Sequence, residues 1–206
     1  MIYLFIDTSI SYPTISLIND NKILFEFHNE IKSDMSSRIL PIIKDALSNN
    51  NLSLNSVDKI FVVTGPGSFT GVRIGVTIAK TIAWALNKKI IPLSSLEYIA
   101  SINTDKKYVV PMIDARRNNV FAGIYDNELN IVKKDCLINL DDLLKEINDD
   151  EYELLSYDSI NNSVTPKPDV IKVINKHLND KSVNPHEIKP NYLKLTEAEE
   201  NRLKND

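Results

Sequence analysis

The sequence predicts an α/β protein with two similar lobes, each a mixed β-sheet flanked by helices. Apolar runs of strand length alternate with helical patterns along the chain. The expected order is βββαβαβα in the first half and βββαβα plus a tail in the second. With 206 residues, 43% of them hydrophobic, the chain is long enough for two small lobes. The repeat is one of element order, and the boundary is expected in 102–107, between lobes 1–103 and 104–206.

The first lobe opens with strands. Residues 2–6 are apolar and end in Asp7, as in a buried strand. Residues 13–29 alternate on both sides of the turn NDNK, which predicts a hairpin. In 34–49 apolar residues recur at helical spacing, and Pro41 inside this segment should kink the helix or confine it to the first turns.

A glycine-rich turn follows the next strand. The strand is 59–63, and residues 65–71, GPGSFTG, form what is called the glycine loop below. The following helix, 71–86, is apolar nearly all round. IIPL (90–93) predicts a short strand, at an edge because of its proline, and SSLE (94–97) is a capping-box pattern that opens another helix.

The second lobe repeats this order. The helical stripe at 140–147 consists of Leu140, Leu143, Leu144 and Ile147. The expected elements are strands at 108–114, 120–126, 130–136 and 152–157, and helices at 140–147, at 168–178 starting from Pro168, and a final short one capped by TEAE (196–199).

The glycine loop has two interpretations. It is not a Walker A motif, because Val72 and Arg73 follow Gly71 instead of Lys and Ser or Thr. Backbone N–H groups that precede a helix attract anions, and Arg73 lies one turn into that helix. Alternatively, the glycines only allow a tight turn and close packing of strand and helix. Spacing alone leaves both interpretations open.

Other polar motifs favour structural roles. Asp7 with Thr8 and Ser9 ends the first strand, but DTSISYPT has no glycine to let a phosphate approach. DARRNNVF (114–121) predicts a charged hairpin tip, although two arginines are also suited to a carboxylate or phosphate. The three histidines form no metal-binding pair, and Cys136 has no base nearby in sequence. We expect no metal, no cofactor and no catalytic residue.

Composition limits the partners and the compartment. The net charge of −4 and the pI of about 5.5 make the chain alone a poor nucleic-acid binder. One cysteine allows no intramolecular disulfide. The N-terminus reaches Asp7 too soon for a signal peptide, and no apolar run has membrane-spanning length. We expect a soluble cytoplasmic protein that does not bind membranes.

Five motifs in order resemble the TsaB family, also called YeaZ, of bacterial tRNA threonylcarbamoyladenosine biosynthesis proteins. The resemblance covers most of the chain, and its most specific motif contains the glycine loop. Lys194 stands where the family commonly has arginine. The motifs are FIDTS near the start, SRILPII (37–43), GPGSFTGVRIG (65–75), DARRNNVFAGIY (114–125) and PNYLK (190–194).

The resemblance implies an actin-like, Hsp70-type (ASKHA) fold and a non-catalytic role. TsaB-like proteins are relatives of TsaD, which transfers the threonylcarbamoyl group to N6 of an adenosine in tRNA. They bind TsaD through first-lobe helices, here about 34–49 and 70–87, the small ATPase TsaE joins the pair, and alone they often form homodimers. Contact with tRNA is then only indirect. The final helix is expected to pack back on the first lobe.

This places the partner interface on two helices and makes the glycine loop a rigid turn that sets the second of them. The alternative that both helices only cover the sheet stays open. The expected partner contacts are Met35, Ile39, Ile42, Ile43, Val72, Val76, Ala79 and Lys80, and the motif-loop residues are Gly65, Pro66, Gly67, Ser68, Phe69, Thr70, Gly71 and Arg73.

Two other function classes compete with the scaffold. One is an actin-like ATPase or small-molecule kinase that uses Asp7 and the glycine loop. The other is a peptidase, a label attached to relatives of the family, for which the sequence offers neither a nucleophile–base pair nor a metal pair.

Overall fold

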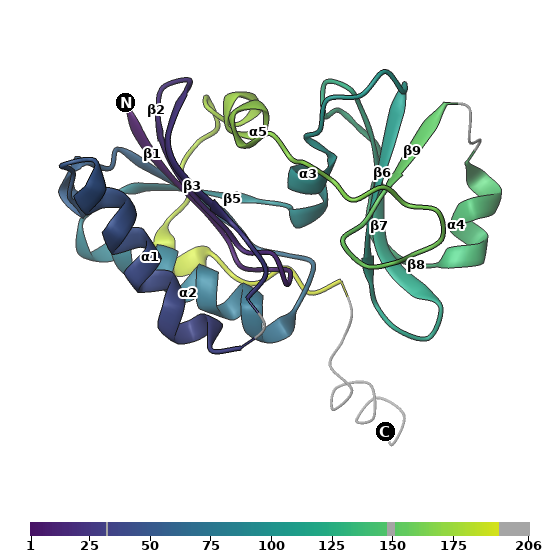
Figure 1. Ribbon diagram of the computed structural model, residues 1–206, viewed down its shortest axis with the longest axis horizontal. Helices are drawn as coiled ribbons and strands as arrows, with labels where there is room; N and C mark the ends of the chain where they lie inside the picture. The colour runs from purple at the N-terminus through teal and green to yellow at the C-terminus, as the bar shows by residue number, and fades with distance from the viewer. Residues whose placement is uncertain (32, 148–150, 194–206) are drawn as a thin grey trace.

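The computed structural model describes residues 1–31, 33–147 and 151–193, and two mixed sheets stand side by side in it (Figure 1). The expected element order is confirmed throughout this part, whereas Lys194 and the helix expected at 196–199 lie outside it. The strand order is β3-β2-β1-β4-β5 in the first sheet and β8-β7-β6-β9 in the second. The first half comprises β1 (Ile2–Asp7), β2 (Thr14–Asn19), β3 (Lys22–His28), α1 (Met35–Asn49), the 3-10 turn η1 (Leu54–Ser56), β4 (Lys59–Val63), α2 (Phe69–Ala85), β5 (Lys89–Leu93) and α3 (Ser95–Ala100). The second half comprises β6 (Tyr108–Asp114), β7 (Asn119–Asp126), β8 (Ile131–Asn139), α4 (Leu140–Glu146), β9 (Tyr152–Leu155), α5 (Val170–Lys176) and the 3-10 turn η2 (Pro185–Glu187).

Both faces of β1 and β4, the strands in the middle of the first sheet, are buried. Along β1, Tyr3 and Phe5 point to one face and Leu4 and Ile6 to the other, because successive side chains of a strand alternate. The Leu4 face packs under α1 and α2, and the Tyr3 face packs under α3 and α5. Two-sided burial explains why these strands are continuous apolar runs.

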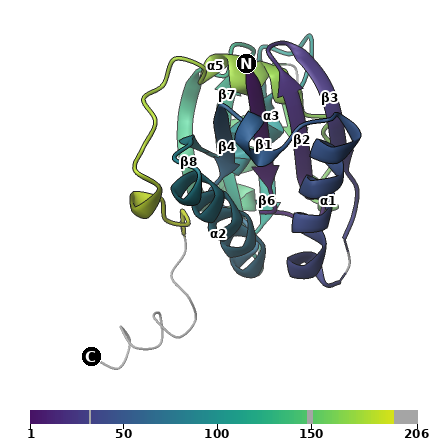
Figure 2. The same cartoon turned by 90° about the vertical axis from the view of Figure 1, so that its left-hand side faces the viewer.

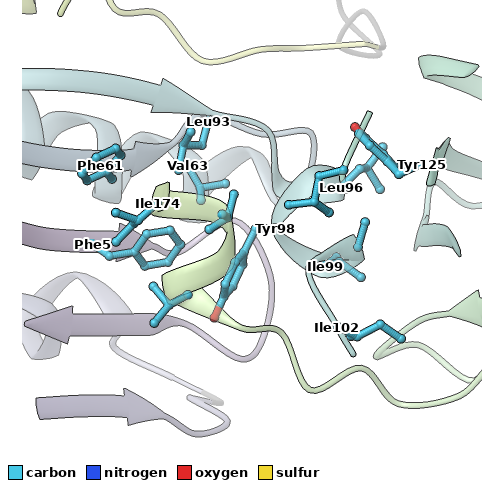
Figure 3. Packing of buried hydrophobic residues seen from close by; sticks show 14 of the residues in the cluster. Phe5, Phe61, Val63, Leu93, Leu96, Tyr98, Ile99, Ile102, Tyr125 and Ile174 are labelled. Atoms are coloured by element: carbon cyan, nitrogen blue, oxygen red, sulfur yellow. The ribbon is translucent and has the colours of Figure 1, made fainter. Parts of the chain in front are cut away.

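A middle layer of apolar side chains joins the two sheets. Phe5, Tyr98 of α3 and Ile174 of α5 meet there, and Tyr125 of β7 reaches the same cluster from the second sheet (Figure 3). The ring centroids of Phe5 and Tyr98 lie 4.7 Å apart. The other face of the second sheet is covered by α4, whose Leu143 is buried. The boundary at 102–107 remains a prediction.

Several helix ends differ from expectation. α2 begins at Phe69, because the Ser68 hydroxyl accepts a hydrogen bond from Gly71 N at 3.2 Å. α5 begins at Val170 behind the cap Asp169, not at Pro168. α1 runs on through Pro41, which is exposed in its second turn. β5, which contains Pro92, is an edge strand, as expected.

The segment after α5 returns to the first sheet, and residues 183–193 are called the strap below. Val183 N donates to the Ile90 carbonyl at 3.1 Å, at the outer edge of β5. Lys80 of α2 donates through Nζ to the Ile188 carbonyl at 2.8 Å, and Ile188 is buried. Figure 2 shows the strap, drawn in yellow-green, beside α2 and on the opposite side of it from α1.

Candidate functional site

The glycine loop lies between the two sheets, at the wall of a cleft of about 650 Å³. Ser9 and Ser68 line the cleft from the first sheet, and Arg116 and Tyr157 line it from the second. The predicted place of the loop, between a strand and the helix it introduces, is confirmed. The loop therefore belongs to both the cleft and α2.

The loop is closed by contacts with the residues that follow β1. Ser68 N donates to the Ser9 carbonyl at 2.7 Å. A Cβ at Gly67, where φ is 156°, would collide with that carbonyl, and a Cβ at Gly71 would collide with the Thr8 carbonyl. These glycines thus permit close approach of the chain's own backbone.

Thr8 completes this closure. Its hydroxyl donates to the Gly71 carbonyl at 2.6 Å and accepts from Gly75 N at 2.9 Å. Both partners lie at the N-terminal end of α2, so the loop after β1 and the helix form one rigid unit. The backbone donors Ser68 N, Gly71 N and Gly75 N are all used inside the chain. These contacts support the structural interpretation of the loop.

Asp7 is a buried acceptor at the base of this unit. Its Oδ1 accepts from Ser9 N at 2.7 Å, and its Oδ2 has no hydrogen-bond partner among the described residues. Burial disfavours the charged form and raises the pKa of Asp7 from 3.8 to about 6. Asp7 therefore organises the turn after β1.

Arg73 does not face the donors of the loop. Its guanidinium carbon lies 3.7 Å from the centroid of the Phe69 ring, and its Nε donates to the Tyr192 hydroxyl at 2.9 Å. Phe69 and Tyr192 stack at 5.0 Å. Arg73 thus binds the strap, and the idea that it assists an anion at the loop is not supported by this geometry.

The charged motif between β6 and β7 is a hairpin tip, as expected. Arg116, Arg117 and Asn118 all have positive φ, between 56° and 66°, and Arg116 N donates to Asp114 Oδ1 at 2.8 Å. Both arginines are exposed, and Arg116 lines the cleft. Left-handed backbone in non-glycine residues costs free energy and concentrates at binding surfaces.

Most of the predicted partner contacts face the protein's own core. The three remaining residues, Met35, Ile42 and Lys80, are half-buried, and Lys80 is held by the strap. α1 and α2 thus turn their most apolar stripes to the first sheet, and contact of the predicted residues with a partner stays a prediction. The fully buried residues are Ile39, Ile43, Val72, Val76 and Ala79.

A groove of about 720 Å³ runs along α1 and the turn that follows it. It is lined by Leu40 and Lys44 of α1, by Ile82 of α2 and by the turn at 52–54. Leu40 is 53% exposed, a high value for a leucine beside a groove. On α2, Ile74 and Ile78 are half-buried. Leu40, Lys44, Ile74 and Ile78 are called the α1/α2 face below.

Two part-buried polar contacts between residues distant in the sequence were not foreseen. Glu97 does not cap α3; its Oε2 pairs with His177 Nε2 of the α5 end at 2.9 Å. Asp135 of β8 binds the hydroxyls of Ser94 and Tyr125. Burial raises the pKa of Asp135. Both contacts join residues at least ten positions apart, so local spacing gave no signal for them.

The surroundings of His28 and Cys136, the remaining candidates for chemistry, favour structural roles. His28 Nδ1 lies 2.8 Å from the Thr14 hydroxyl and its Nε2 lies 3.0 Å from the Tyr157 hydroxyl. Burial lowers its pKa. Cys136 is partly buried, and burial raises the pKa of its thiol. The described residues contain no cluster of three or more His, Cys, Asp or Glu side chains placed to hold a metal, and no helix among them is long and apolar enough to cross a bilayer.

Comparison of sequences connects the chain to one pathway. The family model described as TsaD: tRNA N6-adenosine threonylcarbamoyltransferase matches residues 29–200. The chain is 30% identical to the tRNA threonylcarbamoyladenosine biosynthesis protein TsaB of Bacillus subtilis, over 97% of this chain and 96% of that protein. It is 34% identical to the TsaB protein of Escherichia coli, over 61% of this chain and 55% of that protein.

Two solved structures from Pseudomonas aeruginosa share the fold. One, described as an uncharacterized protein with similarity to peptidase YEAZ, has a TM-score of 0.78 at 20% identity and covers 94% of this chain and 99% of its own. The other, YeaZ, has a TM-score of 0.75 at 20% identity and covers 93% of this chain and 100% of its own. With the family-model match, they confirm the expected actin-like (ASKHA-type) fold.

Proposed function

This chain belongs to the TsaB (YeaZ) family, and we propose that it is a non-catalytic subunit that binds TsaD through α1 and α2 and supports TsaD in modifying tRNA. Family membership gives it a role in tRNA threonylcarbamoyladenosine biosynthesis. In the proposed assembly TsaE joins the pair, and tRNA contacts the chain only through the complex. The chain then works in the cytoplasm, where tRNA is modified.

The observation that carries the proposal is the α1/α2 face. Leu40 borders the 720 Å³ groove and is 53% exposed, and Ile74 and Ile78 of α2 are half-buried. Apolar surface around a groove is typical of a site that receives side chains of a partner helix. Two helices from each protein would pack as a four-helix interface, and a stable interface buries about 1,600 Å² in total.

The closure of the glycine loop supports the non-catalytic part of the proposal. In phosphate-binding loops backbone donors point at the ligand. Here Ser68 N is hydrogen-bonded to the Ser9 carbonyl, and Gly71 N and Gly75 N are bonded to side-chain hydroxyls of the same unit. These bonds fix the start of α2 and engage part of the donors that a phosphate would need.

We predict that Leu40→Asp and Ile78→Glu each weaken binding to the cognate TsaD by at least about tenfold, because a charge must lose its water when the apolar surface is buried. Affinity is measured by calorimetry with full-length proteins, and TsaE recovery by pull-down. Ile131→Asp, at an exposed isoleucine of β8, is the matched control and should bind normally.

Reconstituted threonylcarbamoyl transfer to tRNA, with and without this chain, tests its role directly. Unchanged TsaD affinity in both face variants, with folding verified by circular dichroism, would show that the partner binds elsewhere. Turnover of ATP, a sugar or a peptide by the isolated chain would contradict the non-catalytic proposal and favour the competing classes.

A further inference from the structure

The strap lies against the glycine loop at the end of β4. Asn191 N donates to the Thr64 carbonyl at 2.7 Å, immediately before the loop. A Cβ at Gly65, whose φ is 109°, would lie only 2.9 Å from the Asn191 carbonyl oxygen. Gly65 therefore leaves room for the strap, as Gly67 leaves room for the turn after β1.

Tyr192 of the strap contacts Phe69 and Arg73 in the first turns of α2, and these three side chains are called the clasp below. The Arg73 guanidinium stacks on Phe69 and donates to the Tyr192 hydroxyl, and the rings of Phe69 and Tyr192 stack on each other. Phe69 is 40% and Tyr192 42% exposed, so the clasp lies at the surface, at the mouth of the cleft. Stacked guanidinium and aromatic groups stabilise each other even at exposed sites.

α2 is held differently on each of its sides. One side packs on the first sheet through Val72, Val76 and Ala79. At 100° per residue, the strap contacts Phe69, Arg73, Lys80 and Trp84 fall within one stripe about 60° wide. Ile74 and Ile78 lie about 100° or more from the centre of that stripe. A roll of α2 about its axis would thus move the strap contacts and the α1/α2 face together.

We propose that Arg73 and Tyr192 are positioning residues, which fasten the strap to the first turns of α2 and thereby set the orientation of the α1/α2 face. This inference rests on the proposed function, because it concerns the presentation of the same docking face. The strap follows α5 in the chain but is fastened to the first sheet and α2. It therefore connects the cleft with α2, the helix that carries part of the α1/α2 face.

The test measures amide hydrogen exchange on the full chain without a partner, for the wild type, Arg73→Ala, Tyr192→Ala and Tyr192→Phe. In both alanine variants, exchange in the glycine loop, the first two turns of α2 and the strap should rise at least about tenfold, while β1 and β4 keep their protection. Tyr192→Phe keeps the ring stack and should recover most of the protection. Arg117→Ala removes an exposed arginine of the hairpin tip and serves as control.

Affinity for TsaD is then measured for the same variants and should fall about tenfold in the alanine variants and recover in Tyr192→Phe. Unchanged exchange in α2, or a uniform rise over the whole chain, would overturn the inference, as would faster local exchange with unchanged affinity. Failure of the wild type to bind TsaD would instead contradict the proposed function. The exchange data would still report whether the contacts of Arg73 and Tyr192 order α2.

Discussion

The carboxyl of Asp7 is completely buried at the end of β1, and one of its two oxygens has no hydrogen-bond partner among the described residues. Its neighbour Thr8 uses its hydroxyl twice, as donor and as acceptor, to fix the start of α2. At the scale of single residues, Thr8 thus ties the segment after β1 to α2. The acidic group at its base is retained at a free-energy cost.

That cost predicts a pH dependence. The folded pKa of Asp7 is raised from 3.8 to about 6, so between these values the native state holds a proton that the unfolded state has lost. The free energy of unfolding should therefore fall as pH rises from about 4 to about 6, by up to about 3 kcal/mol. Asp7→Asn keeps the acceptor for Ser9 N and should remove this part of the slope.

Urea denaturation at a series of pH values measures the effect. Only the difference between wild type and variant is used, so other titrating groups cancel. Asp45→Asn, at an exposed position of α1, should leave the profile unchanged. Parallel profiles for wild type and Asp7→Asn would mean that the pKa of Asp7 is not raised in the native state, which would contradict the prediction.

At the scale of elements, the edge strands of the two sheets differ in how well they are protected from pairing with another chain. The outer edge of β9 is bridged by Val164, whose N donates to the Leu154 carbonyl at 2.8 Å, and that of β5 receives Val183. β8 ends its sheet, and Ile131 and Val132 are more than half exposed on it. Lys133 and Lys134 follow them on this strand, and charge on an edge strand opposes pairing with another chain.

We predict that Lys134→Val makes the protein self-associate through β8, because it removes an exposed charge from a nine-residue edge that already carries apolar side chains. Light scattering after size exclusion should show a higher mass than for the wild type at the same concentration. Lys145→Val, the same change on the exposed surface of α4, is the control. Equal masses for Lys134→Val and wild type would show that this lysine does not guard the edge.

At the scale of the whole molecule, the two sheets are held together by the middle layer and by polar contacts at its rim. His177 at the end of α5 pairs with Glu97 of α3 at 2.9 Å and with Asp180 at 2.7 Å. The hydrogen bond to Glu97 is the main cause that raises the pKa of His177 above 6.5. Protonated His177 thus ties the helices that lie between the sheets.

This contact predicts a loss of stability with rising pH. The native state holds the His177 proton more tightly than the unfolded state, so the stabilisation is complete below pH 6.5 and disappears as pH rises through the higher native pKa. Glu97→Gln should flatten this decline and lower stability on its acidic side. Thermal unfolding of the wild type and of Glu97→Gln between about pH 6 and pH 9 measures this decline in stability. Glu128→Gln, at an exposed loop position, should retain the decline, and a decline of equal size in Glu97→Gln would exclude the contact as its cause.

The sequence by itself determined the order of the elements, the two mixed sheets and the place of the glycine loop, because these depend on local periodicity, on turn residues and on motifs that survive at 30% identity. Only the tertiary structure decided which side of α2 faces outward. A helix that is apolar nearly all round has no single buried stripe to read, so Val72, Val76 and Ala79 could not be told from Ile74 and Ile78.

The contacts of the strap and the Glu97–His177 contact were also decided only by the tertiary structure. Arg73 and Tyr192 are 119 positions apart, and Glu97 and His177 are 80 apart. Such contacts follow from how the chain returns across the sheets, and local spacing carries no information about that return. The tertiary structure therefore decided how the cleft, the glycine loop and α2 are joined.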